Sequence, residues 1–227
     1  MNKIEIIPAI LPRDYAELEE KVSLVKDLVK TIQIDICDGQ FVQNATWPYR
    51  KDDITFGQLL SQEQGLPNWN KIDFEIDLMA NRAEEIVEDW ISVGATRIIV
   101  HTEMNGDLIQ AIEKMKDKVE IGLALNIETP LEKVEPFISE INFIQCMGID
   151  NIGFQGQSFD REVIEKIKLI KNKYTDMIVS VDGGVSEDNA QALADAGADR
   201  LVVGSAIFNS ENIIETIRTL RQVKALI

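Results

Sequence analysis

Residues 177–206 read MIVSVDGGVSEDNAQALADAGADRLVVGSA and contain a complete strand–helix–strand unit. The runs Met177–Asp182 and Arg200–Val203 are short and rich in β-branched residues, which favour strands. Between them, Ser186–Ala196 has the apolar spacing of a helix that packs by one face, and Gly197 can adopt the left-handed conformation that ends a helix. Two strands joined through a helix pair in parallel by a right-handed crossover.

The same unit recurs along the whole chain. The predicted strands are Ile4–Ile10, Thr31–Ile36, Ile72–Met79, Arg97–His101, Val119–Leu125, Ile141–Met147, Met177–Asp182 and Arg200–Val203. The predicted helices are Asp14–Lys30, Arg82–Val93, Gly106–Met115, Phe159–Lys173, Ser186–Ala196 and Glu211–Val223, and the irregular stretch Tyr49–Asn70 is expected to hold a ragged second helix and a loop.

Eight alternating units in 227 residues predict an α/β protein, a (β/α)8 TIM barrel in a single domain over residues 1–227. An open, doubly wound sheet is the alternative fold. The sequence has no Gly-x-Gly-x-x-Gly after its first strand, which disfavours a dinucleotide-binding version of that alternative.

The amino-acid composition argues against two classes of binding partner, nucleic acids and membranes. The net charge of −16 would repel nucleic acid and anionic membranes, so neither is an expected partner. No apolar run reaches the roughly 20 residues of a membrane helix, and the N-terminus does not resemble a signal peptide, so we expect a cytoplasmic protein. Cys37 and Cys146 are expected to be buried thiols without a catalytic role.

Acidic residues close several predicted strands, at the end of the barrel where active sites of this fold lie. Alternation along the strand places Gln33 and Asp35 on one face, and we expect Asp77 and Asp182 to point inward as well. Each Asp could instead cap a helix, but three on separate strands favour a shared site. Converging carboxylates require either a bound cation or one carboxyl with a raised pKa. The oxygen ligands favour Mg²⁺, Mn²⁺ or Fe²⁺ over zinc, and a metal-free site is the other possibility.

The glycine-rich loops after the last strands predict an anion site. The loops contain Gly183 and Gly184, and then Gly204 and Ser205, at the usual phosphate-binding position of this fold. A third segment, Gly153–Ser158, is expected to fold over the ligand as a lid. Because the chain is strongly acidic, phosphate binding must depend on local backbone N–H groups. His101, the only histidine, is either a packed strand residue or a polar contact inside the barrel, and we assign it no catalytic role.

In its motifs and their order, the chain resembles the ribulose-phosphate 3-epimerase family over nearly its whole length. The matching motifs, in order, are Pro8–Leu11, Ile34–Val42, Asp77–Met79, Gly156–Phe159, Val181–Gly184 and Gly204–Phe208. The resemblance implies an isomerase of carbohydrate metabolism, in the pentose phosphate pathway, that acts on a phosphorylated ketose. Barrels of this kind often associate through their outer helices, so we also expect a homo-oligomer.

The resemblance also implies roles for individual residues. Asp35 and Asp182 would exchange the C3 proton of D-ribulose 5-phosphate through an enediolate, giving D-xylulose 5-phosphate. The metal ligands would be Gln33, Asp35, Asp77 and Asp182, with Gln33 and Asp77 standing where the family has histidines. The expected substrate-binding and phosphate-binding residues are Met79, Met147, Gly153, Gly156, Gln157, Gly183, Gly184, Gly204 and Ser205.

Further departures from the family pattern lie in the first strand, beside the first Asp and in the lid. Ala9 replaces a substrate-contacting serine, Cys37 replaces a methionine, and Ile152 and Gln155 stand where proline and glycine are expected.

Because of these departures, two alternative functions stay open. One is a decarboxylase or lyase on the same barrel, which the absence of Asp-x-Lys-x-x-Asp and of lysines within the predicted strands disfavours. The other is a non-catalytic protein that binds a phosphorylated sugar.

Overall fold

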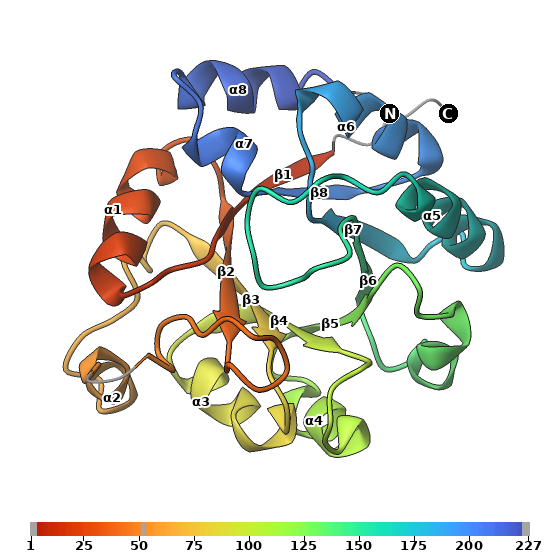
Figure 1. The fold of residues 1–227 in the computed structure, drawn as a ribbon. Coiled ribbons are helices and arrows are strands. Elements are labelled where there is room, and N and C mark those ends of the chain that lie inside the picture. The colour runs from red at the N-terminus through yellow and green to blue at the C-terminus, as the bar shows by residue number, and fades with distance from the viewer. Residues whose placement is uncertain (1–3, 51–52, 224–227) are drawn as a thin grey trace.

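The computed structural model describes residues 4–50 and 53–223. Within them, eight parallel strands close into a barrel in the order β1 to β8 (Figure 1). The strands are β1 (Glu5–Ile10), β2 (Thr31–Cys37), β3 (Asp73–Met79), β4 (Ala95–His101), β5 (Glu120–Leu125), β6 (Phe143–Met147), β7 (Ile178–Asp182) and β8 (Arg200–Val203). The predicted barrel is confirmed, and the open sheet is wrong because β1 also pairs with β8.

Helices surround the barrel and cover the outer face of the strands (Figure 1). The helices are α1 (Tyr15–Val25), α2 (Thr55–Leu60), α3 (Val87–Ser92), α4 (Leu108–Met115), α5 (Glu162–Lys173), α6 (Glu187–Ala196), α7 (Ser205–Phe208) and α8 (Ile213–Leu220). Three short 3-10 turns are η1 (Ala83–Glu85), η2 (Leu131–Lys133) and η3 (Glu135–Phe137). No helix among the described residues is long and apolar enough to cross a membrane.

The strand–helix–strand unit of residues 177–206 forms as expected. Ser186 and Asn189 close a reciprocal capping box at the start of α6, and Gly197 ends the helix at a φ of 110°. Ala190 and Leu193 lie on the buried face of the helix. The main hydrophobic core lies between such helix faces and the outward side chains of the strands.

Two predicted helices differ most from the structure, while the others differ by at most three residues at an end. The helix expected over Asp14–Lys30 ends at Val25, after which the chain turns toward β2. The helix expected over Arg82–Val93 is divided into η1 and α3. Arg82 has a left-handed φ of 53°, and the buried Glu84 accepts a hydrogen bond from the backbone of Asp107, so contacts between distant segments override the helical pattern.

Charged side chains fill the end of the barrel at which the strands begin. Arg97 lies 3.3 Å from Glu5, 3.5 Å from Glu75 and 3.1 Å from Glu120. Arg200 lies 3.2 Å from both Glu5 and Glu120. Burial raises the pKa of Glu75 to about 7, against the opposing effect of the two guanidinium groups. We refer to these five residues as the ion cluster.

Candidate active site

A pocket opens at the C-terminal ends of the strands and contains about 510 Å³ of empty space, counted out to its mouth. Asp35 and Asp182 line it. So does every residue that the sequence indicated for substrate or phosphate: Met79, Met147, Gly153, Gly156, Gln157, Gly183, Gly184, Gly204 and Ser205. Among the described residues, no lysine or arginine lines this pocket. An anion bound here must therefore be held by neutral donors.

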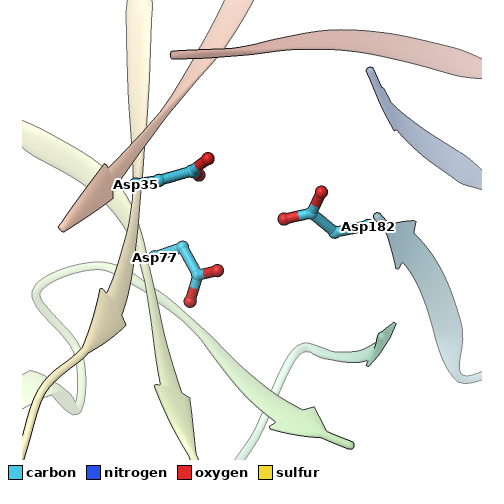
Figure 2. A group of neighbouring side chains, drawn as sticks. All are labelled: Asp35, Asp77 and Asp182. Carbon is cyan, nitrogen blue, oxygen red and sulfur yellow. The ribbon is translucent and has the colours of Figure 1, made fainter. Parts of the chain in front are cut away.

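Three carboxylates converge at the base of the pocket (Figure 2). Asp35 and Asp77 extend from neighbouring strands, where they are paired in register, and Asp182 points toward them from the opposite wall of the barrel. One oxygen from each lies within 4.8 Å of the others. The predicted inward orientation of all three side chains is confirmed.

Gln33 joins the two facing aspartates. Its single amide nitrogen, Nε2, donates to Asp35 Oδ1 and to Asp182 Oδ2, each at 2.7 Å. Gln33 is fully buried, so these bonds act in a medium of low polarity. Strand alternation places Gln33 on the same inward face as Asp35, one layer deeper in the barrel.

Burial and mutual repulsion make these carboxyl groups hard to ionise. Desolvation raises the pKa of Asp35 well above its usual range, and Asp182 and Asp77 add to the effect. Desolvation and Asp77 raise the pKa of Asp182 to about 7, although Gln33 and His101 oppose the rise. Both effects favour the protonated form of a carboxyl, so the pair is suited to holding one protonated and one ionised group, the arrangement that proton transfer needs.

His101 belongs to the same buried network. Its Nε2 lies 3.1 Å from Asp77 Oδ1, and its Nδ1 lies 3.8 Å from Glu103. Burial alone would lower the pKa of His101, but the adjacent Asp77 reverses the effect and raises it. Of the two alternatives given by the sequence, the structure favours the polar contact. Asp77 lies two residues before the end of β3 and His101 ends the neighbouring strand β4, so the sequence places both near the same end of the barrel but does not pair them.

The carboxylate cluster fits a hard divalent cation. Its donors are oxygens, and Gln33 Oε1 is buried with no hydrogen-bond partner among the described residues. The contact with His101 would hold Asp77 in place beside a cation, as supporting hydrogen bonds do in metal sites. The cysteines add no ligand, because Cys37 and Cys146 are buried free thiols whose pKa burial raises, in agreement with the sequence.

The predicted lid lies over the pocket. Gly153 and Gly156 have left-handed φ angles of 83° and 73°, which a glycine adopts without strain. Asn44, from the loop after β2, donates to the Gly153 carbonyl at 2.8 Å. Gln155, between the two glycines, also lines the pocket. The loop is therefore held against the barrel by residues of other segments.

Facing carboxylates at the C-terminal end of a closed parallel barrel are suited to moving a proton between two faces of a bound molecule. Residues 5–208 match the model of the ribulose-phosphate 3 epimerase family. The chain is 33% identical to the ribulose-phosphate 3-epimerase of Synechocystis sp., over 98% of this chain and 95% of that protein. It is 30% identical to the Bacillus subtilis ribulose-phosphate 3-epimerase, over 97% and 100% respectively. The chain belongs to the ribulose-phosphate 3-epimerase family, a family of isomerases.

Solved structures share the barrel at much lower sequence identity. The 3-hexulose-6-phosphate synthase of Salmonella typhimurium is 15% identical, with a TM-score of 0.68 over 97% of this chain and 98% of that one. The 3-keto-L-gulonate-6-phosphate decarboxylase of Vibrio cholerae is 13% identical, with a TM-score of 0.70 over 97% of each chain. These similarities concern the fold alone. The described strands contain no lysine, and family membership does not favour the decarboxylase, lyase or binding-protein alternatives.

Proposed function

We propose that this protein interconverts D-ribulose 5-phosphate and D-xylulose 5-phosphate, with Asp35 and Asp182 as the catalytic acid and base. The observation that carries the proposal is the pair of facing carboxylates on β2 and β7, bridged by one amide of Gln33. Inversion at a carbon needs a proton removed from one face and returned on the other. Facing carboxylates, one protonated and one ionised, meet that requirement.

The reaction follows from this geometry. The ionised aspartate takes the proton from C3, and the electron pair forms an enediolate with the neighbouring carbonyl. The protonated aspartate on the opposite wall then gives its proton to C3, and the configuration is inverted. In the reverse direction the two residues exchange roles. The raised pKa values of both groups keep the acid protonated at neutral pH.

The phosphate would bind at the loops after β7 and β8. Gly183 and Gly184 have left-handed φ angles of 102° and 67°, so the backbone can turn sharply there. Gly204 and Ser205 follow β8 and line the same pocket. We infer that backbone N–H groups of these residues, together with Gly153, Gly156 and Gln157 of the lid, hold the phosphate, and that Met79 and Met147 contact the sugar.

We also infer that Asp35, Asp77 and Asp182 would hold a divalent cation, with the amide oxygen of Gln33 joining them once that amide turns over and gives up its two bonds to the aspartates. Mg²⁺, Mn²⁺ or Fe²⁺ suit these oxygen donors better than zinc. When bound, the cation would supply positive charge that offsets the charge developing on the reacting oxygens. Mn²⁺ binding to the metal-stripped protein can be followed by electron paramagnetic resonance. Asp77→Asn should weaken that binding about tenfold or more, since removing a ligand costs more than removing its support.

The test of catalysis is deuterium incorporation at C3 of ribulose 5-phosphate in heavy water, with each cation supplied in turn. Asp35→Asn and Asp182→Asn should each abolish incorporation, because an amide neither takes nor gives the proton. Asp73→Asn is the matched control, since Asp73 is an exposed residue at the other end of β3. Undiminished incorporation in either Asn variant of the pair would remove that residue from the mechanism.

We further propose that the protein works in the cytoplasm as a homo-oligomer. The free thiols of Cys37 and Cys146 suit a reducing compartment. Exposed apolar side chains on and near the outer helices, including Ile54, Trp69 and Ile214, offer contact area for a second copy. Light scattering coupled to gel filtration would give the mass in solution, and a monomer at all concentrations would contradict the oligomer.

A further inference from the structure

The lid sends one side chain to the far wall of the pocket. Gln155 Nε2 donates to the carbonyl oxygen of Ala9, the residue before the end of β1, at 3.2 Å. The same nitrogen lies against Gly204, just after β8, since a Cβ placed on Gly204 would come within 2.8 Å of it. Gln155 therefore spans from the lid to the place where β1 and β8 meet.

The junction of β1 and β8 is next to the loops that are expected to hold phosphate. Because the surroundings are acidic, a neutral hydrogen-bond donor there would contribute strongly to phosphate binding. The pocket is lined by no lysine or arginine within the described chain, and its base carries Asp35 and Asp182. The whole chain has a net charge of −16. A phosphate in this pocket gains no ionic partner from the side chains that line it, so each N–H donor close to it accounts for a large part of its binding.

The amide of Gln155 has hydrogen-bonding capacity beyond its bond to Ala9. A glutamine amide carries two N–H groups and one oxygen, and the Ala9 carbonyl occupies one N–H. The residue is only partly buried and lines the pocket, so its second N–H is available to a ligand. Ala9 itself has no polar side chain and cannot make such a contact.

We propose that Gln155 is a specificity-determining residue that donates its side-chain amide to the phosphate of the substrate while its bond to Ala9 holds the lid across the pocket. The inference rests on the proposed function for the identity of the sugar, but the binding of phosphate by Gln155 does not depend on that identity. Phosphate and lid then stabilise each other: the anion is bound more tightly when the lid is in place, and the lid is held more firmly when the anion is bound.

The test compares Gln155→Ala and Gln155→Glu with the wild type by calorimetry, using inorganic phosphate, ribulose 5-phosphate and unphosphorylated ribulose as probes. We expect Gln155→Ala to weaken binding of both phosphorylated probes about tenfold, the effect of losing one hydrogen bond to a charged partner. Gln155→Glu should weaken it further, because the carboxylate repels both the anion and the Ala9 carbonyl. Affinity for ribulose should not change, since it lacks the phosphate.

Gln43→Ala is the matched control, because Gln43 is an exposed glutamine at the groove beside the pocket mouth and does not line the pocket. Its phosphate affinity should equal that of the wild type, and thermal melts should show that all variants fold. Phosphate affinity of Gln155→Ala within about twofold of wild type would overturn the inference, as would an equal loss for ribulose. A wild type that binds phosphate through Gln155 but exchanges no C3 proton would overturn the proposed reaction alone.

Discussion

Replacing Gln33 by leucine tests whether the bridging amide sets the acidity of the catalytic pair. The substitution keeps the size of the side chain but removes both 2.7 Å bonds, to Asp35 and to Asp182. A hydrogen bond to an ionised carboxylate contributes about 1.5–3 kcal/mol. At about 1.4 kcal/mol per pKa unit, losing the bond to the ionised group raises the pKa of the first ionisation of the pair, from two protonated carboxyls to one, by roughly 1–2 units.

The sign of the effect follows from the role of the base. Proton abstraction requires one ionised carboxylate, so activity is lost as the pH falls through that pKa, which for Asp182 is about 7 in the intact site. In Gln33→Leu the acidic limb of the profile should therefore move to higher pH, and the rate at pH 6 should fall more than the rate at pH 9.

The assay is the rate of deuterium incorporation at C3 from about pH 5 to pH 9, measured on metal-stripped protein and again with Mn²⁺. Ser180→Ala is the control, because Ser180 is also a buried polar residue of the barrel interior but bonds neither Asp35 nor Asp182: it donates to Gln145, which in turn donates to Asp77. An acidic limb that stays within roughly 0.3 units of wild type in Gln33→Leu, or that moves equally in Ser180→Ala, would refute the reasoning.

The other predictions concern stability. The pKa of Glu75 is raised to about 7, so the folded protein holds this proton after the unfolded chain has released it, and the contribution of this group to stability should fall by up to about 3 kcal/mol as the pH rises from 4 to 8. Glu75→Gln should show a smaller fall in denaturant titrations, and an identical fall would contradict the assignment. Gly184→Ala should cost about 1–3 kcal/mol, because Gly184 has a positive φ and the new Cβ would lie 2.8 Å from the backbone of Phe159. A loss in thermal melts no larger than that of Gly57→Ala, a site with open space around it, would contradict this expectation.

The strands were predictable because each is a short apolar run that the barrel buries on both faces. β8, Arg200–Val203, has the predicted bounds, and β7 begins one residue later than expected, at Ile178. Helix bounds were less predictable, because contacts far apart in sequence decide them. Glu84 is an example: its side chain turns to the backbone of Asp107, and the expected helix is interrupted there.

The site could be predicted at the level of individual residues but not of their contacts. Alternation and strand ends were enough to bring Asp35, Asp77 and Asp182 together. The bond from Asp77 to His101 depends on the register between β3 and β4, which no local pattern specifies. The position of Gln155 depends on the path of a loop, whose backbone the sequence does not determine.

The ion cluster affects how the catalytic aspartates exchange protons with solvent. The side chain of Glu75 is 0% exposed and that of Arg200 is 7% exposed, so the narrow end of the barrel is plugged beneath the aspartates. Among the described residues, the pocket beside the lid is the opening to solvent that Asp35 and Asp182 line. In the proposed reaction one aspartate keeps the proton taken from C3 while the other has given its own proton to the product, so the pair must exchange or redistribute a proton through the pocket before it converts the same substrate again.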